Sequence, residues 1–334
     1  MKFSLIICTY MRPESLVKLL NSVNIQSKYP DEILIIDGSL NEEAKRALDK
    51  NDFKNLKYFL VSEQERGLTK QRNFGISKVG YDIEIVCFLD DDTVLEPDYF
   101  EKLLQTYVLF PEALGVGGYT SNEIKWEKVP ENYKANITEF YYDGWKRKDG
   151  SRFILRKKLH LDSDCPPGFA PNFSHGRSVG FLPPSGKIYQ TEQLMGGISS
   201  FRKTVFSLFS FSTYFEGYGL YEDGDFTLRV SKQGKLYLNT AAKLYHFHDE
   251  SGRPNKYKYG KMVVRNGWYV WRVKNPNPKF NDRLKWNLIT ILLTLIRGTN
   301  IITSSNNRKE ALTETLGRLA GFFSLLFNKP RLEI

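Results

Sequence analysis

The sequence predicts an α/β fold with a mostly parallel central sheet and helices on both of its faces. Strand-like and helical segments alternate through the first hundred residues, and the strand-like segments are apolar throughout. Continuous apolar strands are typical of parallel sheets that are covered on both sides. Three of these segments end in polar clusters, at Thr9-Tyr10, Asp37-Gly38-Ser39 and Asp90-Asp91-Asp92. Because such sheets bind ligands at the carboxyl ends of their strands, we expect the functional site at this edge.

The individual elements follow from the spacing of apolar residues. We expect strands at residues 3–8, 31–37, 56–61 and 82–89, and helices at 13–23, 42–50, 69–77 and 97–107. Residues 120–190 are rich in Lys, Tyr, Pro and Gly, which predicts loops that line a substrate face. Order returns at 196–205, followed by a helix at 222–231, a strand at 235–239 and helices in the last fifty residues.

Composition fits a globular protein of one large domain with an appendage. The 334 residues are 41% hydrophobic and 26% charged, which excludes disordered, collagen-like and coiled-coil chains. Three cysteines (Cys8, Cys87, Cys165) are too few for a disulfide framework and indicate a reducing compartment. No signal peptide is apparent, because Arg12-Pro13 soon follows the short apolar run at residues 3–8.

The net charge of +10 is unevenly distributed along the chain. Residues 243–285 hold eleven Lys or Arg and three Asp or Glu. Such an excess is compatible with phosphate-bearing substrates, nucleic acid or an anionic membrane. A solvated basic face is the alternative interpretation.

The acidic triplet is a candidate metal site. In extended backbone alternate side chains share one side, so Asp90 and Asp92 can face one site while Asp91 turns away. Carboxylates of this kind suit Mg²⁺ or Mn²⁺, which bridge to a diphosphate. An acidic turn that caps the next helix is the structural alternative.

A basic loop and an acidic helix start are two further candidates. In residues 65–73, Gly67 lets backbone approach a ligand, and Lys70 and Arg72 can neutralise phosphate charge. Glu222, Asp223 and Asp225 open a predicted helix. A carboxylate there can take a proton from a hydroxyl, or can simply stabilise the helix terminus, as we expect for Asp225.

His246 and His248 follow a predicted strand and are two residues apart, so in extended backbone they share a face. That arrangement suits a metal or diphosphate contact, with a core or capping histidine as the alternative. There is no G-x-G-x-x-G after the first strand and no G-x-x-x-x-G-K-[ST] motif, which disfavours dinucleotide oxidoreductases and P-loop NTPases.

Taken together, six segments resemble the family 2 glycosyltransferases, inverting enzymes with a GT-A fold. They occur in the family's order: CTYMRP (8–13), ILIIDGS (33–39), ERGLTKQRNFGIS (65–77), FLDDDTVLEPDYF (88–100), GGISSFRKTVF (196–206) and YEDGDFTLRV (221–230). The family commonly has two acids at the second strand end, whereas Ile36 occupies the first position here. That departure affects only the contact beside Asp37.

The resemblance implies a role for each matching residue. Nucleotide and donor binding would fall to the residues of the strand ends, the basic loop and the glycine pair: Thr9, Tyr10, Arg12, Asp37, Gly67, Arg72, Asp90, Asp91, Gly196 and Gly197. Asp92 and Asp90 would hold Mn²⁺ or Mg²⁺ through a DXD motif, with His246 or His248 as a further ligand. Asp223, beside Glu222, would be the catalytic base.

The resemblance also implies the domain organisation and the reaction. Residues 1–250 would be the catalytic domain, with a nucleotide-binding half at about 1–115 and an acceptor half at about 116–250, and residues 251–334 a basic helical extension. The reaction would move a sugar from a UDP, dTDP or GDP donor to a hydroxyl of a glycan or lipid-linked acceptor, as in polysaccharide biosynthesis. The alternatives are a catalytically silent nucleotide- or sugar-binding module and a nucleic-acid binder, which the acidic strand ends disfavour.

The C-terminal third suggests where the protein acts. Two apolar runs, 286–296 and 316–327, are too short to span a bilayer and lie after a basic stretch at 253–285. That pattern is typical of a protein that lies on an anionic leaflet. We therefore expect a cytoplasmic protein that docks on the inner face of the cell membrane; packing on the sheet or in a homo-oligomer is the alternative.

Overall fold

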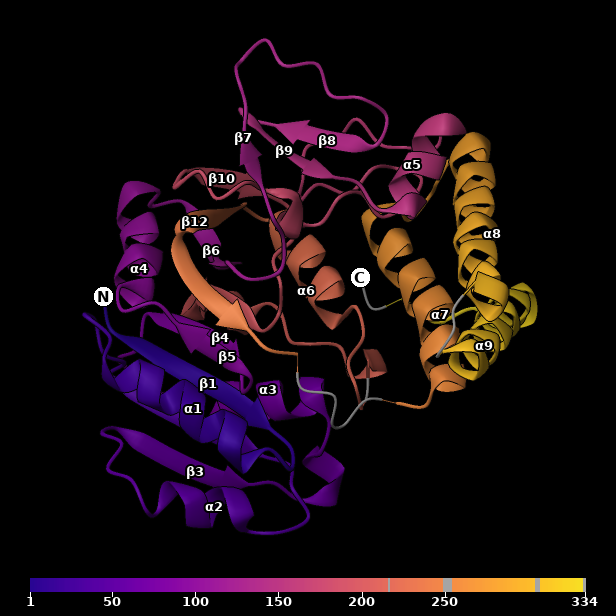
Figure 1. Cartoon of the computed structure of the whole chain (residues 1–334). Coiled ribbons are helices and arrows are strands. Elements are labelled where there is room, and N and C mark those ends of the chain that lie inside the picture. Colours follow the sequence, from indigo (N-terminus) through magenta and orange to yellow (C-terminus); the bar gives the residue numbers. More distant parts are fainter. Residues whose placement is uncertain (216, 249–253, 304–306, 333–334) are drawn as a thin grey trace. The chain divides into compact units, whose positions relative to one another are not determined.

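The structure, a computed structural model, describes residues 1–215, 217–248, 254–303 and 307–332 (Figure 1). The predicted boundary at residues 250–251 and Arg253, the first residue of the predicted basic stretch, lie outside the described residues. The chain divides into two compact units. Unit 1 comprises residues 1–124 and 184–253, and unit 2 comprises residues 125–183 and 254–334.

Unit 1 is built on a mixed sheet. Its elements in chain order are β1 (Phe3–Thr9), α1 (Pro13–Asn24), β2 (Glu32–Asp37), α2 (Glu43–Leu48), β3 (Leu56–Leu60), α3 (Leu68–Ser77), β4 (Ile85–Asp90), β5 (Thr93–Leu95), α4 (Tyr99–Leu109), β6 (Ala113–Thr120), β10 (Ile188–Thr191), β11 (Ile198–Arg202), α6 (Glu222–Ser231) and β12 (Lys235–His246). Short 3₁₀ turns at Glu63–Glu65, Lys203–Ser207 and Thr213–Phe215 connect them.

The described strands of unit 1 form a nine-stranded sheet in the order β10-β12-β6-β11-β4-β1-β2-β3, with β5 paired to β12. Strands β1, β2, β3, β4, β6 and β12 run in one direction, and β5, β10 and β11 run against them. The prediction of a mostly parallel sheet is confirmed.

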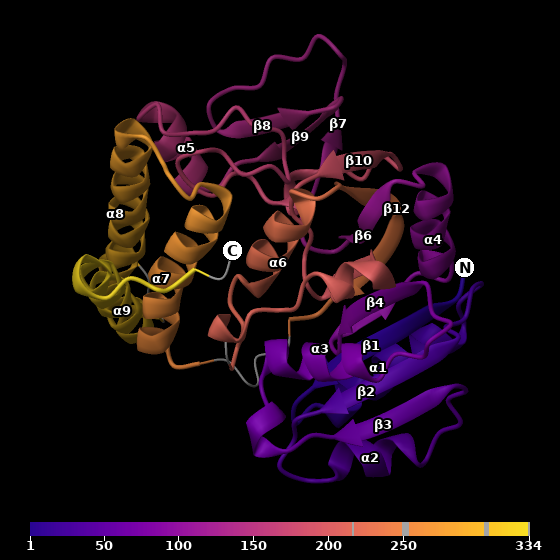
Figure 2. The same cartoon turned by 180° about the vertical axis from the view of Figure 1, so that it is seen from behind.

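Helices cover both faces of this sheet. On one face, Leu16, Leu19 and Leu20 of α1 pack in the same core as Leu5 and Ile7 of β1. On the other face, α3 approaches so closely that a Cβ at Gly75 would lie 2.8 Å from Ile6. Figures 1 and 2 show these helices from opposite sides.

Unit 2 contains a small antiparallel sheet and a group of helices. Its elements are β7 (Glu127–Lys128), β8 (Glu139–Tyr142), β9 (Trp145–Lys148), α5 (Ser151–Lys158), a 3₁₀ turn at Val179–Phe181, α7 (Lys256–Lys274), α8 (Phe280–Thr303) and α9 (Arg308–Phe327). Arg177 is buried and binds Asp149 (2.9 Å) and Asp162 (2.6 Å). Most of the stretch at 120–190 lies outside helices and strands, as the sequence predicts, but β7, β8, β9 and α5 are elements that the sequence did not predict there.

The C-terminal helices pack closely on one another. Figures 1 and 2 show α7, α8 and α9 side by side. A side chain at Gly317 of α9 would overlap the Tyr257 carbonyl of α7, so glycine permits this close approach. Buried Glu314 of α9 binds Arg297 of α8 at 2.8 Å and Arg318 at 2.7 Å. The predicted helices near the C-terminus are confirmed.

Strands β6 and β12 and helix α7 are among the elements that differ from the sequence prediction. Strand β6 was missed because its glycines interrupt the apolar pattern; a Cβ at Gly118 would lie 2.5 Å from the ring of Tyr99. Helix α7 was missed because basic residues and tyrosines obscure its buried positions. Strand β12 has twelve residues instead of the expected five.

The apolar segment expected at 286–296 is also longer than predicted. It lies inside α8, which has 24 residues. Among the described residues, α8 is the one helix long and apolar enough to cross a membrane, judged by length and composition. Only 17% of its most apolar window is buried. The apolar run at 286–296 is therefore part of a helix that is long enough to span a bilayer, contrary to the prediction that this segment is too short.

Candidate active site

The three polar strand ends lie side by side at the carboxyl edge of unit 1. In the sheet register Thr9 of β1 pairs with Asp37 of β2, and Cys8 pairs with Asp90 of β4. Three segments that are far apart in the sequence thus bring their polar residues to one edge. The edge on which the sequence placed the functional site is formed as predicted.

Asp37 is fully buried beneath this edge. Its Oδ1 accepts the amide of Ser39 at 2.7 Å, and its Oδ2 accepts the hydroxyl of Tyr58 at 2.7 Å. Ser39 in turn accepts the amide of Met11 at 2.7 Å. The loops after β1 and β2 are therefore tied together around Asp37, with the Tyr10 side chain 38% exposed beside them.

The three acidic residues at the end of β4 make two different sets of contacts. Asp91 is buried and accepts the hydroxyl of Thr9 at 2.7 Å and Arg12 Nη1 at 3.1 Å. Burial raises the pKa of Asp91 to about 6, although Thr9 and Arg12 lower it in part. Asp91 thus connects β4 to the loop after β1.

Asp90 and Asp92 share a site with His246 at the end of β12. One ligand atom from each of the three residues lies within 4.8 Å of the others. His246 Nε2 lies 3.0 Å from Asp92 Oδ1. Burial lowers the pKa of His246, but its hydrogen bonds to Asp92 and Glu123 outweigh burial and raise the pKa to about 10.

The donor atoms of this cluster fit a divalent cation. Two carboxylates and an imidazole are ligands that Mn²⁺ accepts, and the carboxylates also suit Mg²⁺. A bound cation requires the imidazole to be neutral. His246 would therefore join Asp90 and Asp92 as a ligand in its neutral form.

A second cluster extends the first. His248 Nε2 lies 3.1 Å from Glu123 Oε1, and His246 Nδ1 lies 3.7 Å from the same oxygen. His248 therefore lies in the Glu123 cluster and not among the Asp90, Asp92 and His246 ligand atoms. Glu123 was missed by sequence reasoning, because it stands in a loop with no pattern around it.

Arg72 and Glu222 form a buried ion pair beneath the acidic triplet. Arg72 Nη1 donates to Glu222 Oε1, and Arg72 Nη2 lies 3.7 Å from Asp90 Oδ1. Burial raises the pKa of Glu222 well above its usual range, with the charge of Asp223 acting in the same direction. Arg72 thus connects the end of β4 to the start of α6.

Gly196 and Gly197 stand between the acids of β4 and α6. The Asp90 amide donates to the Gly197 carbonyl at 2.9 Å, and the Gly196 amide donates to Asp223 Oδ2 at 3.3 Å. A Cβ at Gly197 would overlap the Asp90 carboxylate. Only glycine leaves room for Asp90 at this position.

Asp223 lies in the first turn of α6 and is partly buried. Its Oδ1 accepts the amide of Gly224 at 2.7 Å. Burial raises the pKa of Asp223, and the hydrogen bonds from Gly224 and Gly196 oppose that shift. Asp225, by contrast, pairs with Arg229 at 2.6 Å within the same helix. The Asp225 carboxylate is therefore engaged within α6, and its expected stabilisation of the helix terminus stays a prediction.

Gly67 shapes the loop before α3. Its φ of 118° is disfavoured for other residues, and a Cβ there would lie 3.1 Å from the Gly217 amide nitrogen. Gln71 accepts the Gly67 amide at 3.2 Å and donates to the Ile36 carbonyl at 2.8 Å. Gln71, like Tyr58, had no signal in the sequence, because its partners lie on other strands.

The chain is similar in sequence to several known proteins. The family model described as "Glycosyl transferase family 2" matches residues 4–174. A "Glucosyl-dolichyl phosphate glucuronosyltransferase" of Haloferax volcanii is 34% identical over 122 residues, which are 35% of this chain and 38% of that protein. The "Uncharacterized glycosyltransferase YwdF" of Bacillus subtilis is 25% identical over 252 residues, or 75% of each chain.

Among solved structures, the fold is similar to that of the mannosyltransferase PcManGT from Pyrobaculum calidifontis in complex with GDP-Man and Mn²⁺. The TM-score is 0.55 at 12% identity, covering 98% of this chain and 88% of that one. At this low sequence identity, the structural similarity shows the GT-A fold and nothing more specific. It confirms the fold class that the sequence predicts.

Proposed function

Because the chain belongs to glycosyl transferase family 2, we propose that it is an inverting enzyme that moves a sugar from a nucleotide-diphosphate donor to an acceptor hydroxyl. The observation that carries the proposal is the Gly196-Gly197 pair. The Gly197 carbonyl accepts the Asp90 amide, and Gly197 also lies against the Asp90 carboxylate. The adjacent Gly196 amide donates to the Asp223 carboxylate at the start of α6. A leaving-group site and a proton acceptor can therefore serve one reaction centre.

The donor would bind along the carboxyl edge of β1, β2 and β4. We assign the nucleoside to the corner formed by Thr9, Tyr10, Arg12 and Asp37, where Tyr10 is exposed enough to contact a base. Gly67 and Arg72 would hold the donor beside this corner, and Asp90 is exposed enough to reach the ribose or the cation. Similar solved structures that contain UDP, or GDP-Man with Mn²⁺, support a nucleotide-sugar donor.

Asp90, Asp92 and His246 would hold Mn²⁺ or Mg²⁺, with Glu123 and His248 beside them. When bound, such a cation stabilises the negative charge of the departing diphosphate. Arg12, 3.7 Å from Asp92, helps to offset the carboxylate charge of this edge. Asp91 contributes to donor binding by positioning Thr9 and Arg12.

Asp223 would be the catalytic base. Its carboxylate takes the proton of the acceptor hydroxyl while that oxygen bonds to the anomeric carbon and the bond to the diphosphate oxygen breaks. Attack from the side opposite to the leaving group inverts the anomeric configuration. Glu222, which binds Arg72, would position that arginine and Asp223 in this step.

We further propose that residues 1–250 form the catalytic domain, of which unit 1 carries the donor site. The acceptor would be a glycan or lipid-linked hydroxyl compound, with the chain docked on an anionic membrane surface from the cytoplasmic side. The names of two relatives, the glucuronosyltransferase above and the "O-antigen chain rhamnosyltransferase RfbN" of Salmonella typhimurium, support a role of this kind.

A donor panel tests the proposal. The full chain is incubated with UDP-, dTDP- and GDP-sugars, Mn²⁺ and a panel of soluble glycan acceptors, and release of nucleoside diphosphate is measured. We expect release from at least one donor and none in excess chelator. If a donor binds but no nucleoside diphosphate is released under any condition, the chain is a silent binding module.

A further inference from the structure

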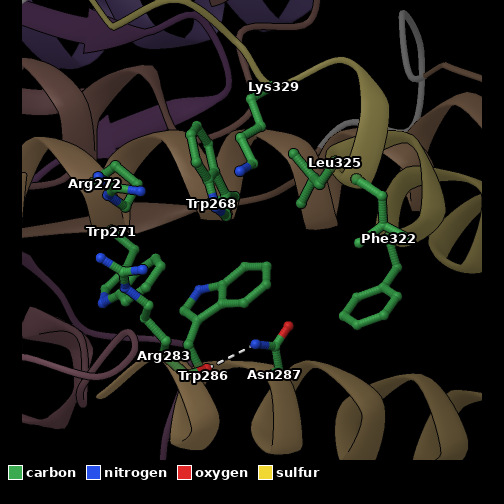
Figure 3. Close-up of a pocket in the computed structure, with 10 residues that line it drawn as sticks. Trp268, Trp271, Arg272, Arg283, Trp286, Asn287, Phe322, Leu325 and Lys329 are labelled. Atoms are coloured by element: carbon green, nitrogen blue, oxygen red, sulfur yellow. Dashed lines mark hydrogen bonds between the residues drawn. The ribbon is translucent and has the colours of Figure 1, made fainter. Parts of the chain in front are cut away.

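Unit 2 contains a pocket of about 240 Å³ between α7, α8 and the end of α9 (Figure 3). We call it the tryptophan pocket, after Trp268 and Trp271 of α7 and Trp286 of α8. None of the assigned donor-site residues lines it. Figure 3 shows the Trp286 ring pointing across the pocket toward Trp268 and Lys329.

Two of the tryptophans, Trp271 and Trp286, form one apolar wall. The rings of Trp271 and Trp286 are stacked, with centroids 5.3 Å apart and an interplanar angle of 18°. The Trp271 indole donates to the Asn172 carbonyl at 2.8 Å, which fixes this ring. The wall is therefore rigid and preformed, as in binding sites for small molecules.

Three cations surround this wall: Arg272, Arg283 and Lys329. Arg272 lies over the rings of Trp268 (5.3 Å) and Trp271 (5.7 Å). In the described part of the chain, no carboxylate oxygen lies within 4.0 Å of the charged nitrogens of these three residues. Burial, and then the charge of Arg283, lowers the pKa of Arg272.

Other arginines of unit 2 form ion pairs with carboxylates. Arg297 and Arg318 share Glu314, and Arg177 binds Asp149 and Asp162. The tryptophan pocket therefore concentrates positive charge that no described acid compensates. An anionic ligand would complement it.

An exposed apolar surface continues from the pocket along α8 and α9. On α8 the exposed residues recur at helical spacing: Leu284, Leu288, Ile291 and Leu295. On α9 they are Leu316, Leu319, Phe323 and Leu326, each at least 41% exposed. Leu326 also lines the pocket, so the apolar stripe of α9 is continuous with the cationic pocket.

We propose that the tryptophan pocket binds the phosphate head group of an anionic membrane lipid, whose acyl chains contact the apolar stripe of α8 and α9. A soluble anion would complement the cations but would leave the stripe without a partner. A phospholipid matches both, since its charge and its apolar chains are joined in one molecule. The site refines the membrane surface proposed above, but it rests on residues of unit 2 alone.

Vesicle flotation with the full chain tests this site. Neutral phosphatidylcholine vesicles are compared with vesicles that also contain phosphatidylglycerol, and part of the lipid carries bromine on its acyl chains. Bromine quenches tryptophan emission at short range, and three of the five tryptophans line the pocket. We expect flotation with the anionic vesicles and quenched emission.

A matched pair of variants separates the pocket from general charge. The pocket variant is Arg283→Gln with Lys329→Gln, and the control is Arg152→Gln with Lys158→Gln, which removes two exposed charges of α5 that do not line the pocket. We expect the pocket variant to bind anionic vesicles about tenfold more weakly than the control and to lose quenching. Sugar transfer to a soluble acceptor, measured as release of nucleoside diphosphate, should be equal in the two variants.

Three outcomes would overturn the lipid site. The first is a wild-type chain that does not float, and the second is an equal loss of binding in the two variants. The third comes from soluble probes: if inorganic phosphate changes tryptophan emission as strongly as short-chain phosphatidylglycerol does at the same concentration, the pocket is an anion site and not a lipid site. None of these measurements depends on sugar transfer.

Discussion

Arg12 and Arg72 in unit 1 lie against carboxylates of the acidic edge, whereas Arg272 and Arg283 in unit 2 lie against tryptophan rings and backbone carbonyls. In unit 1 these arginines form ion pairs with carboxylates, and ligand atoms of Asp90, Asp92 and His246 lie close together. In unit 2 the pocket charge has no described counterpart. From this difference we infer that the first region holds a cation and a diphosphate, as proposed above, and that the second attracts an anion.

Asp92→Asn should have the largest effect on unit 1. It removes a carboxylate from the cation cluster, so we expect turnover to fall on the order of 10⁴-fold and metal dependence to disappear. Initial rates across a Mn²⁺ titration measure this. Asp98→Asn, an exposed acid outside the cluster, is the matched control. Full activity of Asp92→Asn in excess chelator would contradict the assignment.

Asp223→Asn should separate chemistry from binding. Loss of a general base costs on the order of 10²–10⁴-fold in kcat, whereas donor affinity should stay nearly unchanged. Single-turnover rates and donor titrations distinguish the two quantities. An equal loss of rate and affinity would assign Asp223 to donor binding instead.

Gly197→Ala should have an intermediate effect. The added Cβ would displace the Asp90 carboxylate, so the apparent affinity for Mn²⁺ should fall about 10- to 100-fold. Gly150→Ala is the control, because a Cβ there has nothing within 4 Å. Unchanged Mn²⁺ affinity in Gly197→Ala would exclude Asp90 from the cation site.

The pH dependence of kcat should show the smallest effect. Asp223 acts only when deprotonated, and burial raises its pKa above the ordinary aspartate value of about 3.9. Activity should therefore be retained above the raised pKa and lost as the pH falls through it. Rates at saturating donor measure this limb, which Asp223→Asn should lack. A limb at or below pH 4 would argue against a buried base.

How far the sequence predicts the structure differs between the two units. In unit 1 the site residues follow apolar strands, and parallel strands must end at one edge, so their convergence could be predicted. Glu123, Tyr58 and Gln71 could not, because their contacts are with residues distant in the sequence. In unit 2, β8 and β9 are short and half-exposed, and lysines and arginines stand among the buried residues of α7. Such elements have little local signal and depend on tertiary packing.

The most direct measurement is the melting temperature of the full chain with UDP, dTDP and GDP donors, with and without Mn²⁺. A ligand at one hundred times its Kd adds about 2.7 kcal/mol to the free energy of unfolding, which is readily detected. We expect at least one donor to raise the melting temperature in Mn²⁺, and chelator or Asp92→Asn to abolish the increase. An increase of the same size in wild type, in chelator and in Asp92→Asn would contradict a cation-dependent donor site at Asp90, Asp92 and His246.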